Sequence, residues 1–342
     1  MTQTAHTGAD PAAVAAARIL LSQIGITPAD ILTGTPAAPT FGEVIPKLRL
    51  TLSPGTLRTY NTHLKHLEQI WHNRPLDTVS KADLDEQART IQTTSRGNRN
   101  GTSAREHFIS TVRCLYRYAE DNNWIHPTRN PARHLARPTR PPSHRRAISS
   151  PGLAEICDVA AHTGNDRELD SLILRLHVET ACRRAGALRL RPRDLDPHQC
   201  LILLREKDEI DRWQPISPTL MHHLRRHAEQ RASPPNEQLL RYRNGKPITR
   251  RRYDHLWTRI GEHLPWVATQ HISTHWIRHT TLTWVERTFG YATARAYAGH
   301  HTHNTGTTAT YVKANLHEIT AALCALTQEP HPLLSNQPTH PA

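Results

Sequence analysis

Two short stretches, TACRRAGAL at residues 180–188 and HWIRH at residues 275–279, decide how the rest of the chain is interpreted. In the first, Arg183 and Arg184 stand among small and apolar residues. Because arginine is costly to bury, this setting suggests an anionic partner, although an ordinary surface pair is the favoured interpretation when the stretch is taken alone. In the second, a spacing of three places His275 and Arg278 on one face of a predicted helix.

The second stretch also contains a histidine pair, because His275 and His279 are four residues apart. That spacing is compatible with a metal site. The metalloprotease pattern, however, needs a glutamate directly after the first histidine, and Trp276 occupies that position. We therefore expect no metal ligands in this domain.

Three further pieces follow the same order along the chain. EKDE at residues 206–209 lies between two predicted strands and places Lys207 on their turn. AGHH at 298–301 contains His300, and TTATYVK at 307–313 contains Tyr311. Each piece is ordinary by itself, since a turn lysine is usually solvated and a tyrosine usually packs. Their order and spacing are what carry information.

The order R…K…H-x-x-R…G-H…Y resembles the catalytic domain of the tyrosine recombinase (phage integrase) family. The resemblance implies a DNA strand-exchange enzyme whose phosphate ligands are arginines and whose nucleophile is a tyrosine. It extends into the N-terminal half, where TLRTY at 56–60 and LYRYA at 115–119 resemble the family's helical core-binding domain. The catalytic residues carried over in this way are Arg183, Lys207, His275, Arg278, His300 and Tyr311.

These residue types suit phosphoryl transfer. Two guanidinium groups can hold a phosphodiester by multidentate hydrogen bonds, and a phenol oxygen can attack its phosphorus. Lys207 is then the candidate general acid, and His275 a base or phosphate donor, with His300 a further donor. The resemblance implies metal- and ATP-independent breakage and rejoining through a 3′-phosphotyrosine, with no cofactor, in integration or excision of a mobile element.

Two departures from the family pattern keep alternatives open. Many members have an acidic residue three positions after the first arginine, where this chain has Gly186. The displacement from His300 to Tyr311 is eleven residues, and nine or ten is common in the family. A catalytically weak relative that acts as a repressor or accessory factor, and a type IB topoisomerase, therefore remain alternative interpretations.

Composition agrees with a nucleic-acid partner. The 342 residues include 43 lysines and arginines against 30 acids, a formal charge of +13, which indicates attraction to DNA or, second, to an anionic membrane surface. We expect no membrane span and no secretory signal, because no apolar run is long enough. The five dispersed cysteines predict free thiols rather than disulfides or zinc, so we expect a cytoplasmic, nucleoid-associated protein.

The predicted fold is mainly α, with a small β-hairpin or sheet in the C-terminal domain. Strands are expected at 198–204 and 212–216, because both are short apolar runs flanking a charged turn. The expected domains are an N-terminal extension with short helices (1–40), a helical core-binding, SAM-like domain (41–131), a basic linker (132–146), a tyrosine-recombinase catalytic domain (147–327) and a disordered tail (328–342).

The connection between the domains is rich in arginine and contains no acid between Asp121 and Glu155. A solvated linker and a DNA-backbone contact are both compatible with it, and its place between two helical domains favours the contact. The predicted DNA-binding residues are Arg129, Arg133, Arg137, Arg140, Arg145 and Arg146.

A last helix at 314–326 has Leu316, Ile319, Leu323 and Leu326 on one stripe. The stripe packs either on its own domain or on a neighbouring subunit, and the family resemblance implies the second. We accordingly expect double-stranded DNA as partner, a monomer in solution, a homotetramer on paired recombination sites, and a possible directionality factor.

Overall fold

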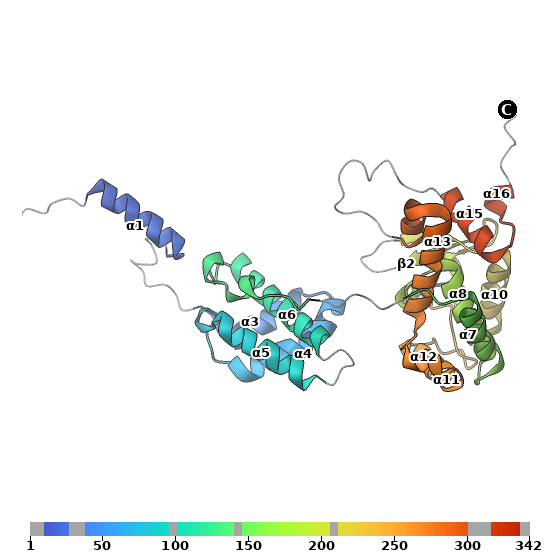
Figure 1. Cartoon of the computed structure of the whole chain (residues 1–342), viewed down its shortest axis with the longest axis horizontal. Coiled ribbons are helices and arrows are strands. Elements are labelled where there is room, and N and C mark those ends of the chain that lie inside the picture. The colour runs from blue at the N-terminus through green and yellow to red at the C-terminus, as the bar shows by residue number, and fades with distance from the viewer. Residues whose placement is uncertain are drawn as a thin grey trace, which may run out of the picture. The chain divides into compact units, whose positions relative to one another are not determined.

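The computed structural model describes residues 10–26, 38–95, 101–139, 146–205, 211–299 and 316–335. They fall into two compact units, Met1–Pro142 and Ser143–Ala342 (Figure 1). Helices form most of both units, and the described part of the second contains a three-stranded antiparallel sheet. The predicted fold class is confirmed. None of the described helices is both long and apolar enough to cross a membrane.

The first unit is built on four helices that share one core. They are α3 (Phe41–Thr51), α4 (Pro54–Trp71), α5 (Lys81–Thr94) and α6 (Thr102–Asp121), and α1 (Pro11–Gln23) precedes them. The residue before each of three helices explains where that helix starts. Thr40 before α3 and Ser80 before α5 each form a capping box, and Ser53 caps α4, whose first residue is a proline. The brief helix expected from Thr27 lies outside the described residues.

The basic linker begins later than the sequence predicted. Two short 3-10 turns, η2 (Pro127–Arg129) and η3 (Pro131–His134), continue the first unit. Ala132 and Leu135 are buried in its core, and Arg113 donates to the Leu135 carbonyl at 2.6 Å. The expectation of an extended connection from residue 132 is therefore wrong for residues 132–135, because apolar side chains there extend the helical core.

The second unit is arranged around α8 (Arg167–Thr180), which is buried on several sides. It packs against α7 (Ser150–His162), α10 (Pro218–Gln230), α13 (Thr274–Tyr297) and α15 (Leu316–Thr327). The remaining helices are α9 (Arg184–Arg189), α11 (Arg250–His263), α12 (Pro265–Thr269) and α16 (Pro332–Ser335), with a 3-10 turn η4 at Pro192–Asp194. Nine of its fourteen residues are buried, the polar Asp170, His177 and Glu179 among them, as befits a helix at the centre of the unit.

The small sheet has the order β1-β2-β3, with β1 at Leu195–Asp196, β2 at Leu201–Arg205 and β3 at Asp211–Pro215. Its register pairs Ile202 with Gln214 and Leu204 with Arg212. The first predicted strand starts three residues too early. Residues 197–200 form a turn in which Cys200 has a φ of 49°, a left-handed conformation that interrupts a strand.

Gly290 divides α13 into two segments. Gly290 has φ 85° and ψ 169°, which only glycine adopts readily, so the chain changes direction there before the segment that ends at Tyr297.

The last helix packs on its own domain. Ile319 and Ala322 of α15 join a cluster with Val285, Ala294 and Tyr297 of α13. This is one of the two alternatives that the sequence left open, and exchange of the helix between subunits stays a prediction.

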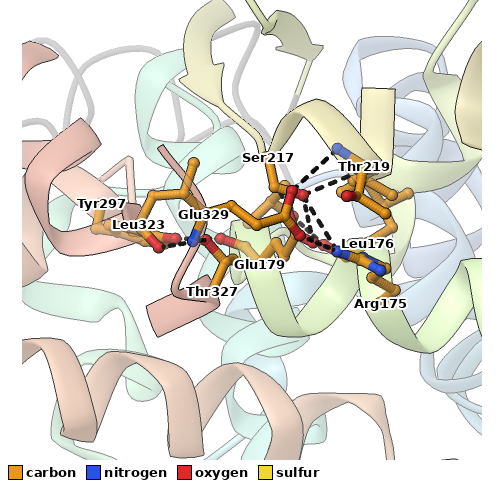
Figure 2. Close-up of polar contacts among 11 residues, drawn as sticks. Arg175, Leu176, Glu179, Ser217, Thr219, Tyr297, Leu323, Thr327 and Glu329 are labelled. Atoms are coloured by element: carbon orange, nitrogen blue, oxygen red, sulfur yellow. Dashed lines mark hydrogen bonds and ion pairs between the residues drawn. The ribbon is translucent and has the colours of Figure 1, made fainter. Parts of the chain in front are cut away.

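The tail prediction is wrong for residues 328–335. Glu329 accepts from Arg175 of α8 at 2.7 Å and from the Thr219 amide of α10 at 3.1 Å (Figure 2). His331 is 2% exposed and lies 3.3 Å from the Cys200 carbonyl. Proline and histidine content suggested disorder, but these specific polar contacts anchor the segment. Residues 336–342 lie outside the described residues.

Candidate active site

The C-terminus of α8 is where the predicted site begins. A helix leaves its last carbonyls without intrahelical partners, and such groups need donors when they are buried. Here five consecutive carbonyls each accept from a side chain. They are Val178 (from Thr281 Oγ1, 2.9 Å), Glu179 (from the Tyr297 hydroxyl), Thr180 (from Arg212 Nη2, 3.4 Å), Ala181 (from Arg278 Nη1) and Cys182 (from His177 Nδ1, 3.0 Å).

We call residues 178–182 with these five donors the carbonyl cage. Three of the donors come from α13, one from β3 and one from α8 itself. Figure 2 shows one of them, with the Tyr297 hydroxyl directed at the Glu179 main chain. Burial raises the pKa of the Tyr297 phenol, which keeps its proton available for donation. The cage therefore fixes the path of the chain just before Arg183.

Arg183 follows the cage directly. Ala181 has a left-handed φ of 48°, which ends α8, and Arg183 then occupies the N-cap position of α9 with φ −74° and ψ 150°. Its carbonyl accepts from the amides of Gly186 (2.9 Å) and Ala187 (3.2 Å). Its side chain is half-buried. The position at which the family often has an acid thus contributes a main-chain amide that holds Arg183 in place.

Arg278 connects two parts of the predicted site. It is only 5% exposed, and it donates to the carbonyl of Ala181 and, at 2.8 Å, to that of Ala298. The first acceptor lies two residues before Arg183 and the second two residues before His300. Because both acceptors are neutral, these bonds aim the guanidinium without cancelling its positive charge. The structure therefore brings the guanidinium of the H-x-x-R arginine close to the main chain that precedes Arg183.

Arg212 lies beside Arg278 in the carbonyl cage, and the sequence did not predict it as a site residue. From β3 it donates to the carbonyl of Thr180 and to Gln214 Oε1. It also lies against Gly299, where a Cβ atom would stand 2.5 Å from Arg212 Nε. Gly299 has a φ of 65°, so both its conformation and this neighbour require glycine. The available signal was its position, five residues after Lys207 on the strand that leaves the predicted turn.

His275 lies in the first turn of α13, one turn before Arg278, and its side chain is exposed. Trp276 and Ile277, between them, face the core. His279 lies 3.4 Å from the Thr283 hydroxyl. Within the described residues, no group of three or more histidine, cysteine or acidic side chains is placed to hold a metal ion.

Lys207, His300 and Tyr311 lie outside the described residues. Their described neighbours are Arg205 and Asp211 on either side of the predicted turn, and Gly299 before the second histidine. The contact of Arg212 with Gly299 places the start of β3 beside the residue that precedes His300. The three residues that the structure does not describe remain predictions at this point.

The predicted DNA-binding arginines differ in their surroundings. Arg133 forms a two-bond ion pair with Glu120, at 2.8 and 3.1 Å, and Arg129 reaches Asp77 at 3.5 Å. Arg137 and Arg146 are exposed, and Arg140 and Arg145 lie outside the described residues. Burial raises the pKa of Glu120, but hydrogen bonds from Arg133 and Asn130 outweigh it and leave the pKa lowered. The charge of Arg133 is therefore largely balanced within its own unit.

A cavity of about 330 Å³ opens between α7, α8 and α10. Arg167, Ser171, Arg175 and His223 are among the residues that line it, together with Leu172. None of the residues lining this cavity is a predicted site residue, and we assign it no part in the chemistry.

Comparison with known proteins identifies the family. The family model described as "Phage integrase family" matches residues 152–318, and the model described as "Phage integrase, N-terminal SAM-like domain" matches residues 47–123. The chain belongs to the phage integrase family. No curated protein sequence matches it. As a family member it is of the tyrosine recombinase class, which the sequence resemblance predicted.

Solved structures share the fold of this integrase-family chain. A lambda integrase tetramer bound to a Holliday junction is 12% identical, with a TM-score of 0.62, over 88% of this chain and 91% of that one. The integrase of transposon Tn1549 in complex with a circular intermediate DNA is 16% identical, with a TM-score of 0.61, over 84% and 99%. The site-specific recombinase XerH bound to its difH substrate is 16% identical, with a TM-score of 0.51, over 72% of each chain.

Proposed function

We propose that this integrase-family protein is a site-specific DNA recombinase that cleaves and rejoins DNA through a 3′-phosphotyrosine on Tyr311, and that it integrates or excises a mobile element. One observation carries the proposal. The Arg278 guanidinium is hydrogen-bonded to the main chain two residues before Arg183, so residues 95 positions apart in the sequence lie close enough for both side chains to serve one phosphate. A pair of fixed arginines suits a phosphodiester.

In the proposed reaction, Arg183 and Arg278 bind the non-bridging oxygens of the scissile phosphate. The phenol oxygen of Tyr311 attacks phosphorus, a bond forms between them, and the bond to the 5′ oxygen breaks. The leaving 5′ oxygen takes a proton, for which Lys207 is the candidate donor, and His275 is the candidate acceptor of the phenol proton. Attack by a 5′ hydroxyl reverses the steps, so the ester is re-formed without ATP.

Arg212 supports the same phosphate site in this proposal. It and Arg278 donate to adjacent carbonyls, Thr180 and Ala181, and contact adjacent residues, Gly299 and Ala298. Guanidinium groups fixed in this way would be placed to stabilise the extra negative charge of a pentacovalent transition state. His300, which follows Gly299, is proposed as a further donor to the phosphate.

Double-stranded DNA is the proposed substrate, and backbone contacts supply most of its affinity. Arg137 and Arg146 are the exposed arginines of the connection that fit this role best. The lambda integrase neighbour is a tetramer on a Holliday junction, and the Tn1549 integrase neighbour is bound to circular intermediate DNA. By analogy we propose a monomer in solution that forms a homotetramer on paired sites, with a directionality factor as a further partner.

Two alternative functions remain distinguishable. A DNA-binding relative without catalysis was suggested by Gly186, but the carbonyl cage offers the chain before Arg183 a means of support that does not depend on that side chain. A type IB topoisomerase would relax supercoiled plasmid that lacks a recombination site, and a site-specific recombinase would not.

The test is covalent capture on a nicked suicide substrate that carries the attachment sequence flanking the element. Wild-type protein should become trapped on DNA in a form that survives denaturation, whereas Tyr311→Phe should bind DNA without being trapped. Tyr291→Phe, at a 63% exposed tyrosine of α13, is the matched control and should be trapped like wild type. Binding without capture by wild type would overturn the proposal in favour of an inactive DNA-binding relative.

A further inference from the structure

A buried histidine and a buried tyrosine lie directly behind Arg183. His177 of α8 and Tyr253 of α11 are 0% and 1% exposed. Their rings meet edge to face, with centroids 5.5 Å apart, and His177 Nε2 lies 3.1 Å from the Tyr253 hydroxyl. His177 Nδ1 lies 3.0 Å from the carbonyl of Cys182. Neither residue is among the six catalytic residues that the resemblance to the family predicted.

The hydrogen-bond partners fix which atom carries each proton. A carbonyl only accepts, so His177 Nδ1 must carry the hydrogen that it donates to Cys182. In the neutral ring Nε2 then has a lone pair, which accepts the hydrogen of the Tyr253 hydroxyl. Burial raises the pKa of the Tyr253 phenol, which agrees with its role as a donor. The Cys182 sulfur, 3.4 Å from Nδ1, faces the same proton.

The Cys182 carbonyl matters because of the peptide bond to which it belongs. That bond is planar, so a fixed carbonyl direction also fixes the direction in which the amide of Arg183 leaves the plane. The carbonyl of Arg183 is held from the other side by the amides of Gly186 and Ala187. Both peptide groups that flank the Arg183 Cα are thus restrained, and this fixes the direction of its Cα–Cβ bond.

We infer that His177 and Tyr253 are positioning residues for Arg183, and that they act through its main chain, whereas many family members have an acidic residue at the position of Gly186. The inference rests on the proposed function. An acid there would hold the guanidinium itself, whereas here the hydrogen-bonded series Tyr253–His177–Cys182 holds the main chain from which the guanidinium extends.

The test compares variants that differ only in the donor to the Cys182 carbonyl. His177→Asn keeps a side-chain N–H close to the position of Nδ1, whereas His177→Leu removes it and keeps an apolar side chain. At saturating suicide substrate, the rate of covalent capture should fall roughly 100-fold in His177→Leu and less than about 10-fold in His177→Asn. Tyr253→Phe should slow it about 5-fold, the effect of one neutral hydrogen bond.

Two readouts separate positioning from a loss of fold. The dissociation constant for uncleaved DNA should change less than about 3-fold in all three variants, because phosphate contacts elsewhere supply most affinity. On an Arg183→Lys background, Tyr253→Phe should cause no further slowing, since the group through which it acts has been replaced. An equal slowing on both backgrounds would overturn the inference.

Nitrogen-15 NMR of the histidine side chains tests the protonation directly. His177 should show a protonated Nδ1 and an unprotonated Nε2 in wild type. A protonated Nε2, or capture by His177→Leu at the wild-type rate, would refute the inference while leaving the proposed function intact. Failure of wild type to be captured at all would instead refute the proposed function.

Discussion

Two groups of arginines in this chain are held in opposite ways. Arg212 and Arg278 of the second unit donate to main-chain carbonyls, whereas Arg129 and Arg133 of the first unit reach the carboxylates of Asp77 and Glu120. A carbonyl accepts a hydrogen bond that orients a guanidinium, but it does not balance the positive charge. A carboxylate directs it and balances its charge.

An arginine oriented by carbonyls can bind an anion such as a phosphate, whereas an arginine paired with a carboxylate mainly stabilises the fold. Arg278 is only 5% exposed, and its two carbonyl acceptors are neutral, so these bonds direct the guanidinium without balancing its charge. Arg133 is paired within its own helical unit at 53% exposure, so a second anion gains less from it. The sequence predicted a DNA partner for Arg278 and for Arg129 and Arg133 alike, because a sequence pattern cannot show what each arginine faces.

The largest effect is expected from Arg278→Lys. Lysine carries the charge but cannot bridge the carbonyls of Ala181 and Ala298 at once, so both the phosphate site and the cage loosen. The rate of covalent capture on a suicide substrate should fall by a factor of about 100 or more, by analogy with loss of an oxyanion-hole donor. Arg133→Lys, as the matched control, should leave the rate unchanged. Equal effects at the two positions would remove the distinction between the two groups.

A smaller effect is expected from Arg212→Gln. Glutamine retains a donor for the Thr180 carbonyl but removes the charge beside Gly299, so capture should slow about 10-fold while thermal stability changes little. The measurements are capture rate at saturating DNA and the melting temperature. An unchanged capture rate would show that Arg212 supports the fold alone.

Glu120→Gln should act in the opposite direction on the first unit. Removing the carboxylate releases the charge of Arg133, so affinity for nonspecific duplex DNA should rise a few-fold at low salt. The slope of log affinity against log salt should steepen by about one unit, if one more phosphate is contacted. Binding titrations at several salt concentrations measure both quantities. An unchanged slope would show that Arg133 does not face DNA.

The smallest effect is expected from Thr281→Val. It deletes one member of the carbonyl cage, the donor to the Val178 carbonyl, at a position 3% exposed. The free energy of unfolding should fall by about 1 kcal/mol, the usual value for one neutral hydrogen bond. Chemical denaturation measures it, and the capture rate should stay within about 3-fold of wild type. A large loss of capture would mean that each bond of the cage is separately needed for the chemistry.

The sequence was sufficient for the fold class, because local periodicity reports on it, and motif order led us to expect Arg278 near Arg183. It was not sufficient for Arg212, whose role depends on the register that pairs β3 with β2 and on its contact with Gly299. Nor did it predict the buried His331 and the bonded Glu329, because their partners lie on α8, α10 and the turn before β2, more than 100 residues earlier in the sequence. Contacts of that kind leave no local pattern.

The most direct test of the central claim is to find which atom of the protein becomes joined to DNA. After capture on a suicide substrate and digestion with trypsin, cleavage at Arg295 and Lys313 should release residues 296–313, which contain both Tyr297 and Tyr311. Fragmentation in a mass spectrometer should place the nucleotide on Tyr311. An adduct on Tyr297, on another peptide or on no peptide would contradict the account.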